Sequence, residues 1–245
     1  MDGTDSIIAG SDTTSTAMSA TLFYLVRNPE ALAKAADEVR RTFSDVEEIA
    51  QGAALNSCAY LRACIDEAMR MSPSVGGIAP REVLSGGMTV DGEPIPEGTV
   101  LGVPHYTIHH NSSYYPRPFS YVPERWLVGG ERKEAQPTGY SDKTAATTTT
   151  TVSDRDVSLA QSAFCPFSIG PRGCIGKGLA YAEMMTALAR TLYLYDLRRA
   201  VGIPDPAEGH PDREWGRHRV DEFQLIDQFT SLKDGPMVEF RRRDV

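Results

Sequence analysis

A chain of 245 residues allows one large domain or two small ones, and it is long enough to bury a core without covalent staples. Its four cysteines, Cys58, Cys64, Cys165 and Cys174, form no C-x-x-C pair, which excludes a disulfide scaffold and a zinc ribbon. The 25 basic and 33 acidic residues give a net charge of −8 without an extended basic block. This balance excludes nucleic acid as a partner.

The sequence also contains no membrane-spanning or secretory segment. Its longest largely apolar stretch, 7–26, is interrupted by Ser11, Asp12 and several threonines, whereas a bilayer span needs roughly 20 apolar residues in a row. The first five residues lack the basic, apolar and small-residue order of a secretory signal. We therefore expect the thiols to stay reduced.

Apolar spacing predicts helices over 6–27, 31–43, 58–71 and 177–197. Asn28 is the expected N-cap of the second helix, with Pro29 at its first position. Asn56 or Ser57 is expected to cap the third helix, which stops before Pro73. The last helix is expected to be largely buried.

The remaining segments are predicted to form small antiparallel sheets and loops. Short β-rich pieces separated by turn residues occupy 78–84, 88–90 and 99–103. We also expect an aromatic, proline-rich meander over 106–127, a mobile insertion without chemistry over 129–162, a cysteine loop over 166–176, and a C-terminal hairpin over 222–242 that pairs strands 223–232 and 237–242.

The sharpest local pattern is the segment 167–176, F-S-I-G-P-R-G-C-I-G, which leads directly into the last predicted helix. Gly170 and Gly176 permit tight turns, and the helix directs its positive end at the sulfur of Cys174. These features favour a thiolate, which suits the proximal position on a haem iron. The alternative from the residues alone is a buried cysteine in a tight turn.

The pattern F-x-x-G-x-R-x-C-x-G is complete in this segment and resembles the haem-binding loop of the cytochrome P450 monooxygenases. Three further segments follow the order of that family. Residues 9–14 (AGSDTT) resemble its oxygen-activating helix, 67–70 (EAMR) its E-x-x-R motif, and 123–126 (PERW) its P-E-R-F/W box. The resemblance extends over nearly the whole chain.

Glu67 and Arg70 lie three residues apart on a predicted helix, so their side chains share one face and are close enough to pair. By itself such a pair is usually a solvated surface contact. The resemblance implies that Arg125 of the meander joins it in a buried structural triad that fixes the meander beneath the cysteine loop.

Asp12 and Thr13 are expected in mid-helix among apolar residues, where short polar side chains are poor helix formers. From the residues alone they are equally explained as a polar helix face. The resemblance implies catalytic roles instead. Gly10 would let the helix open a groove for oxygen, the Thr13 hydroxyl would hold oxygen or a water there, and Asp12 would relay protons from solvent.

The resemblance also implies haem b as the cofactor, with Cys174 as its metal ligand. The haem propionates need cations, for which Arg172 matches the family position and Arg81 is a second candidate. Phe167, beside Gly170 and Gly176 in the loop, is placed to shield the sulfur from water. Three histidines are predicted to be meander residues and not ligands, namely His105, His109 and His110.

The implied fold is α+β, mainly α: the C-terminal half of the cytochrome P450 fold with small antiparallel β-sheets, as one partial domain over 1–245. The haem would lie between the first and last helices. The implied enzyme is a monooxygenase that inserts one oxygen atom of O2 into a small lipophilic substrate. The region from His109 to Trp126 looks most like fungal members that hydroxylate secondary metabolites.

The implied partner is a flavoprotein NADPH reductase that docks near the cysteine loop, where Lys177 would assist. Intact family members of this kind sit on the cytosolic face of the endoplasmic reticulum membrane through an N-terminal anchor. This sequence shows no anchor or signal, so a cytosolic location is expected for the chain itself.

Because the resemblance covers only the C-terminal half or so of the family, we hypothesise that the chain is truncated at its N-terminus or mis-started. The alternative function is then an inactive haem-binding remnant. A haem-thiolate isomerase or dehydratase is a third class, which the intact Asp12-Thr13 pair disfavours.

Overall fold

The computed structural model describes residues 3–135 and 147–244. Its helical elements, in chain order, are α1 (Gly3–Arg27), α2 (Pro29–Thr42), η1 (Val46–Glu48), α3 (Ala53–Asn56), α4 (Ala59–Met71), α5 (His105–His109), η2 (Pro123–Trp126), α6 (Asp154–Ser162), η3 (Gly170–Arg172) and α7 (Lys177–Leu194). None of the helices in these two ranges is long and apolar enough to cross a bilayer.

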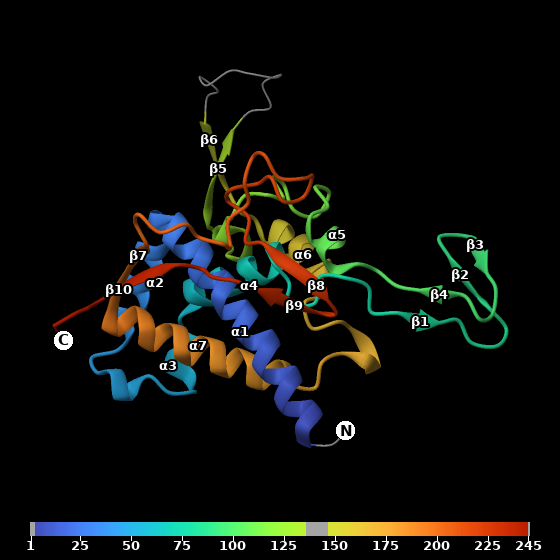
Figure 1. Cartoon of the computed structure of the whole chain (residues 1–245), viewed down its shortest axis with the longest axis horizontal. Helices are drawn as coiled ribbons and strands as arrows, with labels where there is room; N and C mark the ends of the chain where they lie inside the picture. The colour runs from blue at the N-terminus through green and yellow to red at the C-terminus, as the bar shows by residue number, and fades with distance from the viewer. Residues whose placement is uncertain (1–2, 136–146, 245) are drawn as a thin grey trace.

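Helices α1, α2, α4 and α7 form the body of the molecule (Figure 1). These helices pack together because each has an apolar face. In α2 the buried residues Ala31, Ala35 and Val39 recur every four positions, and the opposite face is charged. These side chains join one apolar cluster with Leu61 of α4 and Leu188 of α7. The mainly helical α+β fold predicted from the sequence is confirmed.

The strands of the described residues form two-stranded antiparallel ladders. They pair β1 (Arg81–Glu82) with β4 (Val100–Leu101), β2 (Met88–Val90) with β3 (Glu93–Ile95), β5 (Glu131–Ala135) with β6 (Thr147–Thr151), β7 (Tyr195–Arg199) with β10 (Val238–Arg242), and β8 (Leu225–Gln228) with β9 (Thr230–Lys233).

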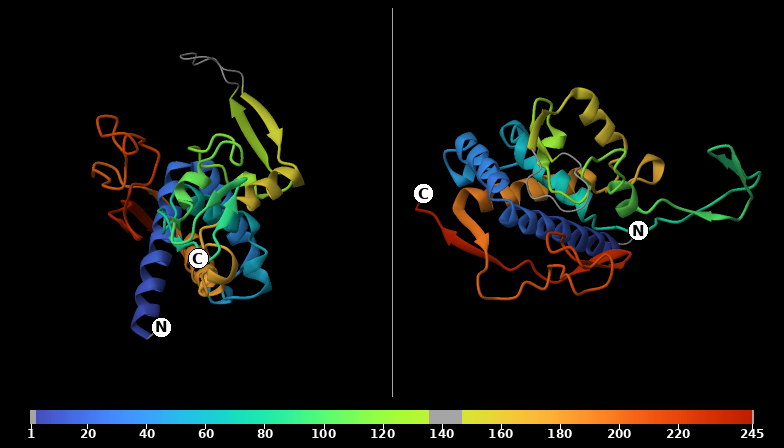
Figure 2. Two further views of the ribbon diagram at one scale, coloured as in Figure 1. Left: turned by 90° about the vertical axis from the view of Figure 1, so that its right-hand side faces the viewer. Right: turned by 90° about the horizontal axis from the view of Figure 1, so that it is seen from above.

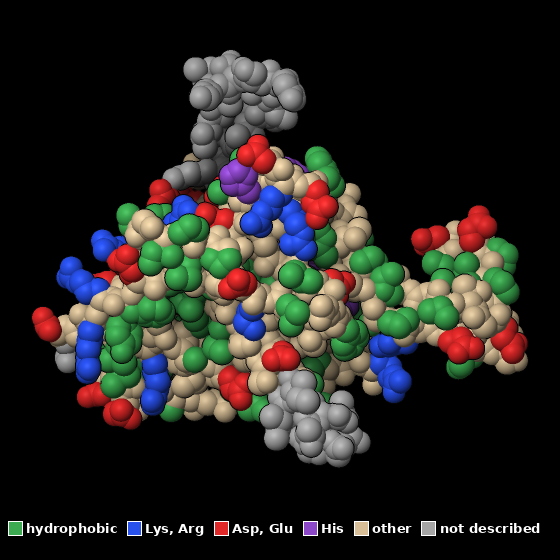
Figure 3. Space-filling model, in the orientation of Figure 1, with side chains coloured by type: hydrophobic (Ala, Val, Ile, Leu, Met, Phe, Trp, Pro, Cys, Tyr) green, Lys and Arg blue, Asp and Glu red, His purple; other side chains and the backbone are tan. Residues whose placement is uncertain are grey.

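Strands β1 to β4 form an arm, residues 79–104, that projects from the helical body in two perpendicular views (Figures 1 and 2). Its tip turns at Asp91 and Gly92, whose φ angles of 50° and 86° suit a tight hairpin turn. Figure 3 shows apolar and acidic side chains together on its surface. Leu84 and Met88 of the arm are exposed.

The predicted hairpin over 222–242 is wrong. The chain turns at Phe229, where φ is 72°, so the segment expected to be one strand folds back on itself as β8 and β9. Strand β10 pairs instead with β7, from Val238 opposite Arg199 to Arg242 opposite Tyr195. Helix α7 accordingly ends at Leu194 and not at residue 197, because the next five residues are extended.

Only part of the predicted insertion over 129–162 lies outside the described residues, namely 136–146. Its flanks pair as β5 and β6, and the segment after them is the helix α6. A capping box between Ser153 and Asp156 starts this helix, and Val157 and Ala160 are buried. The described part of this stretch therefore has regular structure, and a capping box starts α6 despite the polar composition.

The predicted helix caps differ in detail from the structure. Asn28 occupies the N-cap position of α2, but its side chain donates backwards to the Tyr24 carbonyl oxygen. Neither Asn56 nor Ser57 caps α4. Instead the carboxylate of Glu38 on α2 accepts from the backbone amides of Tyr60 and Leu61, at 2.9 and 2.8 Å.

These two amides are among the donors that the first turn of α4 leaves unpaired, so Glu38 caps the helix from a neighbouring element. We expect Glu38→Ala to lower the free energy of unfolding by about 1–2 kcal/mol, the usual effect of losing an N-cap. Urea unfolding followed by circular dichroism measures it. Asp37→Ala removes the adjacent exposed carboxylate, paired only with Arg41, and should change stability by less than about 0.5 kcal/mol. Equal effects of the two substitutions would contradict the cap.

Candidate functional site

The cysteine loop is shaped by two close backbone contacts. The amide of Cys174 donates to the Phe167 carbonyl oxygen at 2.8 Å, and the amide of Gly173 donates to that of Gly170 at 3.0 Å. Gly170 has φ of 71°, in the left-handed region that favours glycine. A Cβ atom at Gly173 would lie 3.2 Å from the Gly170 oxygen. Glycine at these two positions is what lets the loop close.

Cys174 is exposed, and it precedes the first residue of α7, Lys177, by three positions. The N-cap Gly176 leaves space beside the sulfur, since a Cβ atom there would come to 3.7 Å from Sγ. Within the described residues, the amides of Ile175 and Gly176 donate to no backbone carbonyl. A thiolate at a helix N-terminus with free amides beside it fits a haem iron in donor chemistry.

Phe167, the residue expected to shield the sulfur, has an aromatic partner in α7. Its ring packs against Tyr181 with a centroid separation of 5.2 Å, on the side of the loop that faces α4. There the loop borders a cavity of about 370 Å³, whose lining includes Cys165 and Phe167 but neither Cys174 nor any residue of α1. The exposed sulfur is therefore not part of the cavity lining.

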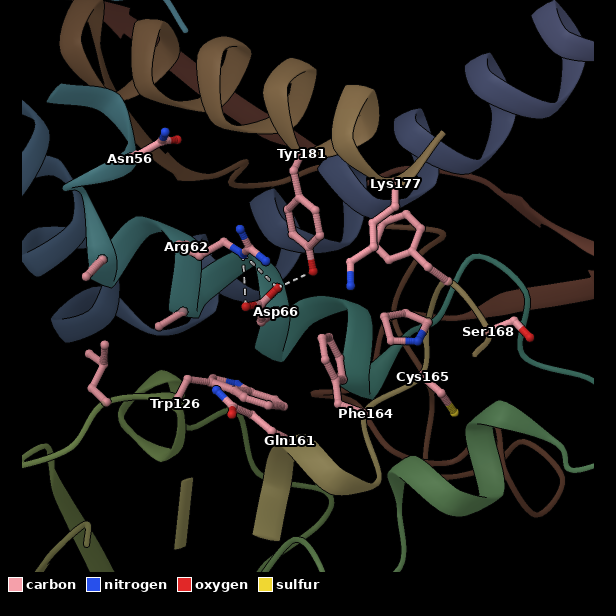
Figure 4. Close-up of a pocket in the computed structure, with 15 residues that line it drawn as sticks. Asn56, Arg62, Asp66, Trp126, Gln161, Phe164, Cys165, Ser168, Lys177 and Tyr181 are labelled. Atoms are coloured by element: carbon pink, nitrogen blue, oxygen red, sulfur yellow. Dashed lines mark hydrogen bonds and ion pairs between the residues drawn. The ribbon is translucent and has the colours of Figure 1, made fainter. Parts of the chain in front are cut away.

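An ion pair lies against this cavity (Figure 4). Arg62 chelates both carboxylate oxygens of Asp66 at 3.1 and 3.0 Å, and the Tyr181 hydroxyl donates to the same carboxylate at 2.7 Å. Burial raises the pKa of Asp66, and the charge of Arg62 opposes that rise. Lys177 points into the same space from α7, so the cavity has two cations at its edge.

The structure brings Glu67, Arg70 and Arg125 together in the interior, where all three are at most 3% exposed. Arg70 donates from Nε to Oε2 and from Nη2 to Oε1 of Glu67, both at 2.9 Å. Arg125 donates from Nε to Oε1 at 3.0 Å. Burial alone would raise the pKa of Glu67, but attraction to Arg125 and Arg70 lowers it to about 2. The carboxylate is therefore charged at neutral pH.

Two further donors to this carboxylate were not predicted. The amide of Val122 donates to Oε1 at 3.0 Å and the indole Nε1 of Trp126 to Oε2 at 3.1 Å. Arg70 extends the network by donating to the carbonyl oxygens of Pro118 and Ser120. The P-E-R-W segment of the sequence pointed to Trp126. The Val122 amide could not be predicted, because a backbone donor does not depend on residue type.

His109 was predicted to be an ordinary meander residue, and it lies at the end of α5. It is fully buried and connects the triad to the cysteine loop: its carbonyl oxygen accepts from Arg70 at 2.8 Å, and its Nε2 accepts from the Cys165 amide at 3.0 Å. Burial lowers its pKa to about 3, helped by the charge of Arg70. A neutral imidazole is required, because Nε2 must accept a hydrogen bond.

Asp12 and Thr13 lie in α1, which continues without a break from Gly3 to Arg27. Asp12 is exposed, and the Thr13 hydroxyl donates to the Ala9 carbonyl oxygen one turn earlier at 2.7 Å. Gly10 is exposed, and a Cβ atom there would meet nothing within 4 Å. Glycine is thus not demanded at this position by packing among the described residues.

The two arginines predicted to meet the propionates lie in different parts of the molecule. Arg172 is exposed in η3 of the cysteine loop. Arg81 is exposed at the base of the arm, where Nη1 donates to the Pro80 carbonyl oxygen. Both guanidinium groups are thus accessible to an anion.

An exposed cysteine held by a tight loop at a helix N-terminus, and braced from behind by a buried carboxylate with two arginines, defines the haem-thiolate class of protein. A family profile described as Cytochrome P450 matches residues 2–212. The chain belongs to the cytochrome P450 family, whose members use haem b and a redox partner that supplies electrons from NADPH.

Fungal proteins are among its relatives. It is 45% identical over 239 residues to "Cytochrome P450 monooxygenase AKT7" of Alternaria alternata, covering 96% of this chain and 42% of that protein. It is 46% identical to a cytochrome P450 monooxygenase of Gibberella zeae (97% and 49%) and 42% identical to "Cytochrome P450 monooxygenase apf8" of Gibberella fujikuroi (97% and 58%). The chain spans about half the length of the curated relatives it matches.

Removing the Glu67 carboxylate would leave two buried guanidinium groups without their counter-ion. We expect Glu67→Ala to lower the free energy of unfolding by about 3–5 kcal/mol and to abolish haem incorporation. Urea unfolding and the absorbance of haem-reconstituted protein measure the two effects. Glu183→Ala, which removes an exposed carboxylate from α7, is the control and should leave both unchanged. A normal haem spectrum for Glu67→Ala would contradict the prediction.

Acidification should destabilise the chain through the same region. Groups with depressed folded-state pKa values stabilise the fold above their unfolded pKa and lose that contribution as pH falls. His109 (about 3) and His110 (about 4) begin to oppose folding below pH 6.5, and Glu67 (about 2) adds to the loss below pH 4.5.

We therefore expect the urea midpoint to fall steadily from pH 7 to pH 4. His109→Gln keeps an acceptor for the Cys165 amide but cannot titrate, so the fall should be shallower in this variant. An identical pH profile for the variant and the parent chain would contradict the assignment to His109.

Proposed function

We propose that this chain provides the haem-binding side of a monooxygenase that hydroxylates a small lipophilic secondary metabolite. The reaction is RH + O2 + NADPH + H⁺ → ROH + H2O + NADP⁺. The observation that supports it most directly is the exposed Cys174 at the start of α7, with a buried glutamate and two arginines behind its loop. Residues 1–245 would act as a single partial domain.

Each predicted site residue has a place in this proposal. Cys174 would ligate the iron, and Gly170 and Gly176 would keep the loop clear of the macrocycle. Arg172 and Arg81 would pair with the propionates. When bound, haem b supplies the iron that activates O2 with electrons from NADPH.

The proton chemistry would belong to α1. The Thr13 hydroxyl can accept a hydrogen bond while it donates to the Ala9 oxygen, so it can hold a water or oxygen molecule in a fixed orientation. The exposed carboxylate of Asp12 is in contact with solvent and can carry protons to that position.

Electrons would arrive from a flavoprotein NADPH reductase on the side of the loop opposite α1. The cavity beside the loop has Lys177 and the Arg62–Asp66 ion pair at its edge, and the ammonium group of Lys177 can attract an acidic partner surface. As in the family members that the sequence resembles, the whole enzyme would sit at the cytosolic face of the endoplasmic reticulum membrane.

Haem binding without turnover is the second candidate. It is favoured by the exposure of apolar side chains on the cysteine loop, where Ile175 is 98% exposed. A loop whose apolar side chains are exposed to water would not keep water away from a bound haem. Oxygen activation requires that water be excluded.

The carbon-monoxide difference spectrum of the reduced, haem-reconstituted chain tests the proposal. We expect the band of a thiolate-ligated haem, which Cys174→Ser should abolish. Cys165→Ser changes a cysteine that lines the cavity just before the loop, and it should retain the band. NADPH-dependent oxygen consumption with added reductase then separates turnover from binding alone. Absence of the thiolate band in the parent chain would refute both candidates.

A further inference from the structure

The carbonyl oxygens of Asp12 and Thr13 receive hydrogen bonds that do not belong to the helical ladder. Ser74, in the loop after α4, donates its hydroxyl to the Thr13 carbonyl oxygen at 2.7 Å. The Asp12 carbonyl oxygen lies 2.8 Å from the Thr16 hydroxyl and 3.1 Å from the Ser15 hydroxyl. Both carbonyls of the proposed proton-transfer pair therefore carry added donors.

These bonds tie α1 to the tail of the chain as well as to the loop. Lys233, at the end of β9, donates from Nζ to the Ser15 hydroxyl at 2.9 Å. The Thr16 hydroxyl also lies 3.3 Å from the Ser231 carbonyl oxygen. The ammonium group of Lys233 polarises Ser15, which strengthens the donation of Ser15 to the Asp12 oxygen.

The loop and the strand are themselves joined. The amide of Ser231 donates to the Ser74 carbonyl oxygen at 2.8 Å, and the Ser231 hydroxyl donates to that of Pro73 at 3.4 Å. Ser74 is thus held by its backbone from β9 while its side chain holds α1. We call this set of contacts, made by Ser15, Thr16, Ser74, Ser231 and Lys233, the α1 clamp.

In the described part of α1, the helix carbonyl that accepts from a side chain of a distant element is that of Thr13, from Ser74. Elsewhere in the described part of α1, side-chain donors to helix carbonyls come from α1 itself or from the next residue, Asn28. An added donor on a helix carbonyl competes with the ladder bond and bends the helix at that point. Gly10 imposes no such constraint, because its surroundings are open.

We propose that Ser74 is a positioning residue for Thr13. By holding the Thr13 carbonyl oxygen, it fixes the position and orientation of this turn of α1. The position of the Thr13 hydroxyl is fixed with it. The inference rests on the proposed monooxygenase function and adds to it a residue that lies outside the four sequence motifs.

The first measurement is amide hydrogen exchange of the chain. Ser74→Ala removes the tether, and amides of residues 13–17 should exchange about fivefold faster, the factor expected for one hydrogen bond. Ser74→Thr keeps the hydroxyl and should restore the parent rates. Ser72→Ala is the matched control: Ser72 belongs to the same loop, but it reaches α1 only at the Tyr24 hydroxyl, so its effect should centre on residues near 24.

The second measurement is the fate of electrons in the haem-loaded chain with reductase and NADPH and no organic substrate. Two outcomes compete: O2 + NADPH + H⁺ → H2O2 + NADP⁺, and O2 + 2 NADPH + 2 H⁺ → 2 H2O + 2 NADP⁺. Misplaced proton delivery favours peroxide. Peroxide released per NADPH should rise several-fold in Ser74→Ala, towards the value of Thr13→Ala. It should stay at the parent value in Ser74→Thr and Ser72→Ala.

Unchanged exchange at residues 13–17 in Ser74→Ala would overturn the clamp. Faster exchange with an unchanged peroxide yield would reduce Ser74 to a structural role and overturn the inference alone. A parent chain without a thiolate band would overturn the proposed function, and this inference with it. The exchange data and the spectrum therefore tell the two failures apart.

Discussion

The buried carboxylate of Glu67 is the interaction on which the rest of this structure depends. It accepts from Arg70, from Arg125, from the Val122 amide and from the indole of Trp126. All five bonds lie in the interior and three of them join opposite charges, so removing any one of these groups would leave its partners buried without a hydrogen bond. Helix α4 and η2 are thereby fixed to each other, and His109 links the network to the Cys165 amide just before the cysteine loop.

Local chemistry was readable from the sequence where the motif and the contact coincide. Glycine at 170 predicted a turn that the structure has, and the spacing of Glu67 and Arg70 predicted a shared face. Contacts between distant segments were not readable. Glu38 caps α4 through amides that lie 22 and 23 residues further along the chain. Strand β10 pairs with β7 because Phe229 turns the expected strand back on itself. Neither choice leaves a signature in local composition.

The contacts of His109 with distant segments could not be predicted from the sequence either. The sequence presents it as one of three histidines in an aromatic segment, with no sign of its partners. In the fold its carbonyl oxygen accepts a hydrogen bond from Arg70, and its ring nitrogen accepts one from the Cys165 amide. A single residue therefore connects the triad to the start of the cysteine loop. Only the three-dimensional arrangement distinguishes it from His105 and His110.

The arm formed by residues 79–104 contributes no member to the three apolar clusters of the molecule. Its ladders are two strands wide, and a lone hairpin of this size is marginally stable in water. We therefore expect the arm to open locally as a unit of its own, at little energetic cost to the helices. A protease should nick it while the four-helix body remains cooperative, which makes the arm a natural place to split or to circularly permute the chain.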